Sequence, residues 1–351
     1  MSFLNHDIVL TADLRTGMVI AQPVFSESGQ ILLEQGVVLT CENIKSLQNW
    51  HVATVWIKRA ELPARLNRPF INTYKETLDL VAATFTKVQK FKEVPIAECK
   101  ELAENYIELM IDIEGVLDSL YRVKTHHAYT FSHSLNVSIL TGLLGKWMGF
   151  KGSQLKNLIL SGLLHDIGKA FIPQKILDKP GPLSVEEMEI VKTHTMQGYN
   201  LLSDCTEIPE AVKLGVLQHH ERENGSGYPL GLKGGDVHIF AKFVAVADVY
   251  DAMTTERVYR KKLPPFVAIN QMLGSMGNQL DSIICLTLLA KLWKYLIGTR
   301  VLLSNGMQGQ VIQVGNIANA KPVIQLDNGH LLDLDNHEQI TIVSILEDPA
   351  L

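Results

Sequence analysis

Apolar residues recur at spacings of three and four through the middle of the chain, and this periodicity predicts a series of helices. The stretch 71–124 begins with such a stripe, and 125–296 continues as consecutive helices. Residues 239–255 are apolar apart from one lysine and the carboxylates Asp248 and Asp251. We therefore expect a helix at 239–255 that is buried on most of its sides.

Near both ends of the chain, the sequence has the pattern of short strands instead of helices. Residues 1–60 combine short runs rich in branched side chains with turns marked by glycine. Toward the other end, short β-type runs are separated by Asn305-Gly306 and Asn328-Gly329. Such pairs are strong hairpin signals. The ends therefore predict a small α+β module and a small all-β domain.

The predicted fold is mainly α, with a central helical bundle between these two modules. A chain of 351 residues is long for a single hydrophobic core, which favours several domains. We expect a small α+β module at 1–60 and a linker with a helical segment at 61–124. The central helical domain is expected at 125–297, and the all-β domain at 298–351.

Composition and charge exclude several classes of function. The chain is 46% hydrophobic and carries a net charge of −5, which does not favour generic binding to DNA or RNA. Neither a secretory signal nor a membrane span is expected, because no basic segment precedes an apolar one and no apolar stretch is long enough. Four scattered cysteines predict buried, reduced thiols in a cytoplasmic protein.

Histidines and aspartates occur at intervals along the predicted central helices. A lone histidine on an apolar face is more often a hydrogen-bonded core residue than a ligand, but here several occur together. Imidazole and carboxylate are ligands of borderline-hard divalent metals. Two such ions can share a carboxylate, clamp a phosphodiester and generate a metal-bound hydroxide. The pattern predicts a dinuclear metal phosphodiesterase, with these candidate ligands: His133, His165, Asp166, His194, His219, His220 and Asp248.

The carboxylates strengthen this prediction. A lone Asp248 inside the apolar segment VAVADVYDA is costly unless it has a partner or a cation. A metal would satisfy Asp248 and Asp166 alike. Ser184 with Glu187 three residues later forms a capping box, and we expect it to open the helix that carries His194.

Five segments in order resemble the motifs of the HD-GYP phosphodiesterase family. The family is named after a His-Asp pair and a Gly-Tyr-Pro triplet, which are here His165-Asp166 and Gly227-Tyr228-Pro229. With their flanking helices the motifs extend over about half of the chain. They are HSLNV at 133–137, LLHDIGK at 163–169, HTMQG at 194–198, HHERENGSGYPLGLKG at 219–234 and VADVYDAMTTERVYR at 246–260.

The resemblance implies an HD-type bundle that hydrolyses cyclic di-GMP to linear pGpG and, in some members, on to GMP. It assigns one metal to His133, His165, Asp166 and Asp248, and a second metal to Asp166, His194, His219 and His220. Lys169 and Arg257 match positions that grip phosphate oxygens, and with Asp166 they form the expected catalytic set. Gly227, Tyr228 and Pro229 border the site as candidates for binding substrate and partner proteins.

Two departures from the family pattern affect the expected cofactors. Some members hold a third metal on a glutamate four residues before the first motif histidine, but that position is Tyr129 here. We therefore expect two divalent transition-metal ions per chain, with iron or manganese favoured among the metals that suit these ligands. The usual Arg-Pro-Tyr is Arg257-Val258-Tyr259, which keeps the arginine.

Other functions stay open at this point. The metal chemistry does not depend on the base, so mixed cyclic GMP-AMP is a second candidate substrate. A catalytically weak sensor of cyclic dinucleotides would have lost a metal ligand or Lys169, and neither is lost. A di-iron oxidase could use similar ligands, but the phosphate-directed Lys169 and Arg257 argue against it. A homodimer is a candidate assembly.

Overall fold

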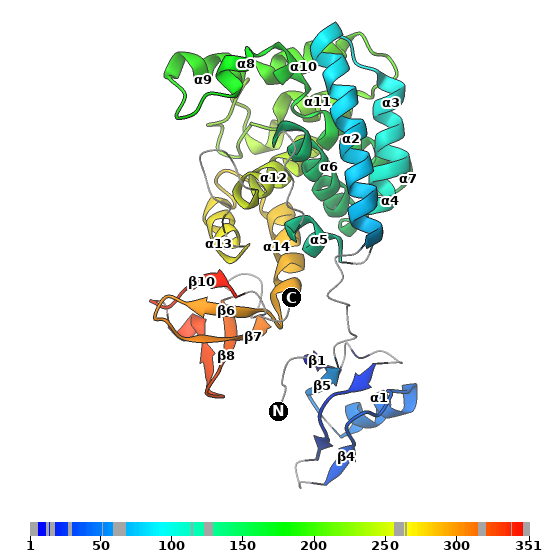
Figure 1. The fold of residues 1–351 in the computed structure, drawn as a ribbon, viewed down its shortest axis with the longest axis vertical. Helices are drawn as coiled ribbons and strands as arrows, with labels where there is room; N and C mark the ends of the chain where they lie inside the picture. Colours follow the sequence, from blue (N-terminus) through cyan, green and yellow to red (C-terminus); the bar gives the residue numbers. More distant parts are fainter. Residues whose placement is uncertain are drawn as a thin grey trace. The chain divides into compact units, whose positions relative to one another are not determined.

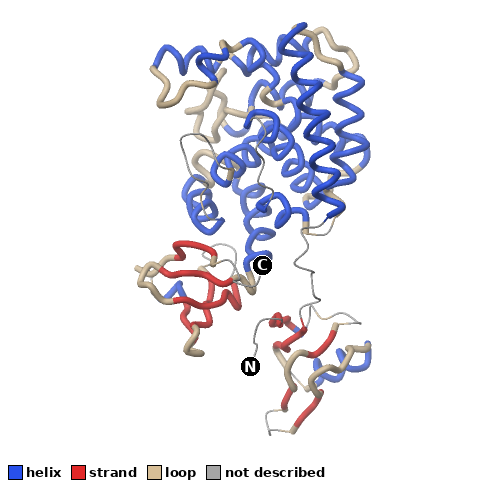
Figure 2. Tube along the Cα trace, viewed as in Figure 1, coloured by secondary structure: helices blue, strands red, loops and turns tan. Residues whose placement is uncertain are grey.

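The structure is a computed structural model, and it confirms the predicted mainly α architecture. Figure 2 shows helices throughout the central part of the chain, with the described strands confined to two terminal modules. The described residues are 6–11, 14, 18–26, 30–50, 52–58, 68–113, 115–122, 129–255, 263, 265–314, 321–337 and 339–346. The chain divides into two compact units, Leu66–Leu292 and the remainder. The exact domain boundaries stay predictions.

The N-terminal module is a small α+β unit, as predicted. Its strands β1 and β2 both pair antiparallel with β5, and β3 pairs with β4. Helix α1 begins after Thr40, whose side chain forms a capping box with Asn43. The elements are β1 (His6–Leu10), β2 (Val19–Ile20), β3 (Val24–Phe25), β4 (Ile31–Leu33), α1 (Cys41–Asn49) and β5 (Thr54–Lys58).

The C-terminal module is a five-stranded antiparallel sheet in the order β10-β6-β7-β8-β9. Both predicted Asn-Gly turns are present, with Gly306 at φ 83° and Gly329 at φ 86°. A positive φ favours glycine because it has no Cβ. The elements are β6 (Arg300–Leu303), β7 (Gln308–Val314), β8 (Pro322–Leu326), β9 (Leu331–Asp333), the short 3-10 helix η5 (Leu334–Asn336) and β10 (Ile342–Ile345).

The central unit is a helical bundle built around α6. Helices α7, α12 and α2 all pack against α6, and Figure 1 shows α2 running alongside it. The elements up to α7 are α2 (Arg68–Phe91), α3 (Ile96–Glu101), the π-helix η2 (Leu102–Ile107), α4 (Glu108–Met110), α5 (Val116–Arg122), α6 (Tyr129–Trp147) and α7 (Gly152–Leu164).

The second half of the bundle contains both regular and short helices. It comprises η3 (Ile167–Phe171), α8 (Gln174–Leu177), α9 (Val185–Lys192), α10 (His194–Ser203), α11 (Glu210–Gln218), η4 (Gly234–Asp236), α12 (Ile239–Thr254), α13 (Pro265–Ser275) and α14 (Ser282–Leu296). The predicted helix at 239–255 is α12, and most of its side chains are buried, including Asp248 and Asp251. Within the described ranges, no helix is both long and apolar enough to span a membrane.

One predicted helix is divided in two. The capping box of Ser184 and Glu187 is present and opens α9, but α9 ends before His194. The backbone N–H and the hydroxyl of Thr193 both donate to the Ile190 carbonyl, at 3.2 and 2.7 Å. Such bonds to the third preceding residue tighten the last turn and end the helix. His194 therefore begins α10 instead of continuing α9.

The cysteine prediction is only partly correct. Cys99 and Cys285 are buried and free, but Cys205 is partly exposed. The side chain of Cys41 lies outside the described part of the chain.

Gly168 allows η3 to lie directly against α10. A Cβ at this position would lie 1.9 Å from the carbonyl oxygen of His194 and 2.5 Å from the backbone nitrogen of Gly198. Real Cβ atoms essentially never approach backbone so closely, so any other residue would push the two elements apart. The close approach keeps Asp166, two residues before Gly168, next to His194.

We predict that Gly168→Ala destabilises the protein by roughly 1–3 kcal/mol, because overpacking against rigid backbone has that cost. Gly274→Ala in α13 is the matched control, since a Cβ there meets no atom within 4 Å. Urea unfolding followed by circular dichroism measures both variants. Equal unfolding midpoints for Gly168→Ala and the unmodified protein would contradict the tight contact.

Candidate metal centre

The structure brings the seven predicted ligands together inside the central unit. They come from α6, the end of α7, the start of α10, the end of α11 and the middle of α12. His133 and Asp166 are only 2% and 3% exposed, and His219 is fully buried. Ligand atoms within 4.8 Å of one another form two groups, one of His133, His165 and Asp248, and one of Asp166, His194, His219 and His220.

Helix ends orient three of the imidazoles. Nδ1 of His165, His194 and His219 lies 2.7–2.8 Å from the carbonyl oxygen of the residue three positions earlier. The last carbonyls of a helix have no helical partner, and a carbonyl can only accept. Each Nδ1 must therefore carry the proton and donate it. In a neutral ring, Nε2 is then left with a lone pair, which is directed into the cluster.

These lone pairs lack satisfactory partners. His194 Nε2 and His219 Nε2 lie 3.3 Å apart, so two acceptors face each other when both rings are neutral. His165 Nε2 and Asp166 Oδ1 are buried, and neither makes a hydrogen bond within the described part of the chain. Buried polar atoms are rarely left unsatisfied. A metal cation accepts lone pairs from imidazole nitrogen and carboxylate oxygen, so this donor set fits a metal site.

Asp166 faces both groups at once. Its Oδ2 lies 3.3 Å from His165 Nε2 and 3.7 Å from His133 Nε2, while its Oδ1 lies 3.3 Å from His194 Nε2. Lys169 Nζ lies 2.5 Å from Oδ2. Burial alone would raise the pKa of Asp166, but Lys169 and the neighbouring imidazoles hold it well below its usual range. The carboxyl group is therefore ionised and available to bind cations.

The imidazoles of the second group are neutral. Burial lowers the pKa of His194 to about 4 and that of His220 to about 3, and it holds the pKa of His219 well below its ordinary value. Neutral imidazole is the form that binds metals. His133 differs: burial lowers its pKa, but the hydrogen bonds to Asp248 and Asp251 outweigh this and raise it to about 9.

Asp251 is a functional candidate that the sequence analysis missed. Its Oδ2 lies 2.7 Å from Nδ1 of His133, so it orients this ring as the helix-end carbonyls orient those of His165, His194 and His219. Carboxylates commonly hold the second nitrogen of metal-binding histidines. The available signal was a second carboxylate in the same apolar helix, three residues after Asp248.

The Gly-Tyr-Pro segment lies beside the second group. The Tyr228 ring stacks on the His220 ring, with centroids 4.6 Å apart, and Lys192 Nζ lies 5.6 Å from the centroid of Tyr228. A Cβ on Gly227 would lie 2.4 Å from Cα of Glu221, so the segment needs glycine there. Pro229 follows Tyr228 through a cis peptide bond. Burial raises the pKa of Tyr228, which keeps its hydroxyl protonated.

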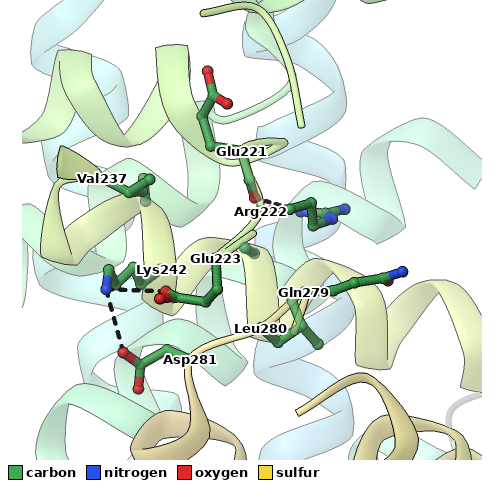
Figure 3. Close-up of a pocket in the computed structure, with 10 residues that line it drawn as sticks. Glu221, Arg222, Glu223, Val237, Lys242, Gln279, Leu280 and Asp281 are labelled. Atoms are coloured by element: carbon green, nitrogen blue, oxygen red, sulfur yellow. Dashed lines mark hydrogen bonds and ion pairs between the residues drawn. The ribbon is translucent and has the colours of Figure 1, made fainter. Parts of the chain in front are cut away.

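One buried and several half-buried charged side chains hold this loop, and Figure 3 shows part of the arrangement. Glu221, only 3% exposed, accepts hydrogen bonds from the backbone N–H groups of Leu230 and Leu232. Lys242 Nζ lies 3.0 Å from Glu223 and 3.4 Å from Asp281, which ties the loop to the turn before α14. The sequence analysis did not single out Glu221, because its partners are backbone groups.

Two predicted positions cannot be compared with the structure. Arg257 and the side chain of Tyr129 lie outside the described residues. The roles of the other site residues remain predictions, although their positions agree with those roles.

Residues 120–284 match the HD domain family. The cyclic di-GMP phosphodiesterase PA4108 of Pseudomonas aeruginosa is 33% identical over 233 residues, which are 66% of this chain and 56% of the relative. The 3'3'-cGAMP-specific phosphodiesterase 1 of Vibrio cholerae is 35% identical over 176 residues, covering 50% of this chain and 39% of the relative. The chain thus spans about half the length of the curated relatives it matches.

A solved structure has a similar fold. It is Bd1817, an HDG"Y"P protein from Bdellovibrio bacteriovorus, which aligns over 82% of this chain and 100% of its own length with a TM-score of 0.55. At 18% identity this likeness concerns the fold alone. The HD domain match and the sequence relatives confirm the resemblance that the five motifs predict: residues 120–284 match the HD domain family, and the chain is similar to cyclic dinucleotide phosphodiesterases.

Proposed function

We propose that this protein is a metal-dependent phosphodiesterase that hydrolyses cyclic di-GMP to linear pGpG, with GMP as a candidate end product. The observation that carries the proposal is the position of Asp166. Its two oxygens face two groups of imidazole and carboxylate ligands, and Lys169 lies against the same carboxylate. A shared carboxylate between two metal positions, with a cation beside it, is suited to phosphoryl chemistry.

The proposed ligand sets follow the two groups. One ion would be held by His133, His165, Asp166 and Asp248, and the other by Asp166, His194, His219 and His220. Two divalent ions bound there would neutralise phosphate charge and lower the pKa of a water molecule. Nitrogen and oxygen ligands suit first-row transition metals, and we propose iron or manganese.

The remaining site residues would bind and orient the substrate. The Lys169 side chain is 25% exposed, so its ammonium can reach a phosphate oxygen from the solvent side. Fixed cations stabilise the charge that grows on the non-bridging oxygens in the transition state. We assign the same task to Arg257. The Tyr228 ring offers a stacking face for guanine, and its protonated hydroxyl can donate a hydrogen bond.

Mixed cyclic GMP-AMP is the second candidate substrate. The Vibrio cholerae relative is named for 3'3'-cGAMP, and metal-assisted hydrolysis of a phosphodiester does not depend on the base. A sensor without turnover is less well supported, because the ligands and Lys169 are all retained. A cytoplasmic location, a protein partner at the Gly-Tyr-Pro loop and a homodimer remain predictions.

The direct test of this function is product analysis. Purified protein loaded with iron or manganese should convert cyclic di-GMP to pGpG, and chromatography of timed samples would show whether GMP follows. A parallel reaction with 3'3'-cGAMP compares the two candidate substrates. A protein that holds two metals but cleaves neither dinucleotide would overturn the proposal.

We predict that Asp166→Asn loses both metals, because the shared carboxylate contributes to each ligand set. Elemental analysis of the purified protein should give close to two ions per chain for the unmodified protein and almost none for the variant. Asp204→Asn, at an exposed carboxylate that is in neither ligand group, is the control and should keep both ions. Two ions retained in Asp166→Asn would refute the bridging role.

Lys169→Ala should keep its metals and lose turnover. Lys169 is not in either ligand group, whereas loss of one cation that stabilises the transition state costs about 10²- to 10³-fold in kcat, by analogy with oxyanion donors. Lys175→Ala, at an exposed lysine in α8, is the matched control. Turnover of Lys169→Ala at the rate of this control would show that Lys169 is an ordinary surface cation.

A further inference from the structure

A chain of hydrogen bonds leaves the candidate metal centre and ends outside the HD domain match. It begins at His133 in α6, passes through Asp251 in α12 and Asn136 in α6, and ends at Tyr74 in α2. The HD domain match covers residues 120–284, so Tyr74 is not part of it. We propose that Tyr74 is a positioning residue for His133 and thereby strengthens metal binding; this inference rests on the proposed function.

Every link of the chain is short. Nδ1 of His133 lies 2.7 Å from Oδ2 of Asp251, and the Asn136 amide donates to Oδ1 of the same carboxylate at 2.9 Å. The Tyr74 hydroxyl then donates to the Asn136 carbonyl oxygen at 2.7 Å. Tyr74, Asp251 and His133 are 1%, 4% and 2% exposed. Burial removes competing water at these three residues, and Asn136 between them is half-buried, so the bonds here have a stronger electrostatic effect than they would at the surface.

The chemistry of the groups fixes the direction of each bond. An ionised carboxylate only accepts, so the NH₂ group of Asn136 must face Asp251 and its oxygen must face Tyr74. Burial and the charge of Asp251 raise the pKa of Tyr74, so its hydroxyl stays protonated and donates. The hydroxyl thus holds the amide in the orientation that Asp251 needs.

Asp251 is in turn prevented from rotating. Its Oδ1 accepts from Asn136 and from the hydroxyl of Thr255, both at 2.9 Å, which leaves Oδ2 directed at His133. On its other side, Nε2 of His133 lies 3.1 Å from Asp248, in the same candidate ligand group. Partners behind the ligands typically change metal affinity by about 10- to 100-fold, and a more distant link should change it by less.

The hydroxyl of Tyr74 is not needed for packing. The same face of α2 is lined by Phe70, Leu78 and Val81, each at most 1% exposed, and the ring of Tyr74 packs 5.7 Å from that of Phe70. A phenylalanine at position 74 would keep these contacts and lose only the hydrogen bond to Asn136. Thr77, also fully buried, donates only within its helix, to the Thr73 carbonyl at 2.6 Å.

The test is manganese affinity in the full chain. Metal is removed with a chelator, and the protein is titrated with Mn²⁺ by calorimetry. Tyr74→Phe should bind Mn²⁺ about fivefold more weakly, the effect of one net hydrogen bond. In an Asp251→Asn background the same substitution should have little further effect, because the link to His133 is already altered. Thr77→Val removes a neighbouring buried hydroxyl and should leave affinity unchanged.

The outcomes separate this inference from the proposed function. Failure of the unmodified protein to bind Mn²⁺ and, in a parallel titration, Fe²⁺ would overturn the proposed function itself. If the unmodified protein binds Mn²⁺ and Tyr74→Phe binds it with the same affinity, only the role of Tyr74 is overturned. The role is also overturned if Thr77→Val weakens binding as much as Tyr74→Phe does, because the cause would then be a general loosening of α2. If Tyr74→Phe does not fold, Asn136→Ala breaks the same link from α6, and unchanged Mn²⁺ affinity in that variant would overturn the role.

Discussion

The central unit depends on the burial of ionisable side chains at one place. Asp166 is 3% exposed and His219 is fully buried, although a carboxylate and an imidazole each cost free energy when removed from water without partners. Part of the cost is offset by Lys169 and by hydrogen bonds to helix ends. The remaining lone pairs face one another, so the arrangement is complete only with a cation among them.

The fold supplies this arrangement through its helix termini. His165, His194 and His219 each follow or interrupt a helix at the point where backbone carbonyls have no partner, and each ring satisfies one of them. The hydrogen bond from Nδ1 to the helix-end carbonyl therefore also directs Nε2 of the same ring into the cluster. The partial negative charge at helix C-termini also favours cations nearby. The hydrogen bonds that complete these helix ends thus also determine the orientation of the ligands.

Much of the site could be predicted from sequence because its ligands occur in short local motifs. His165 and Asp166 are adjacent, and Asp248 is conspicuous because the surrounding helix is apolar. Likewise, alternating helical and strand periodicities predict the three parts of the fold. Local pattern fails where the partner is distant: His133 and Asp251 are 118 residues apart, and nothing near either residue indicates the pairing.

The role of Glu221 and the end of α9 also could not be predicted from local sequence. The buried Glu221 binds backbone N–H groups of Leu230 and Leu232, which every sequence provides, so its role depends on the path of the loop. The end of α9 at Lys192 coincides with hydrogen bonds from the backbone N–H and the hydroxyl of Thr193 to the Ile190 carbonyl, which helix periodicity does not describe. Such hydrogen bonds can be assigned only once the three-dimensional positions of the donors and acceptors are known.

The candidate ligands are spread from His133 to Asp248, on helices separated by several loops. An ion held by residues so far apart along the chain acts as a reversible cross-link, which removes entropy from the unfolded chain much as a disulfide does. Ions that bind the folded state alone also shift the folding equilibrium by mass action. Metal supply in the cell would then govern how long each molecule survives proteolysis, and not only how fast it works.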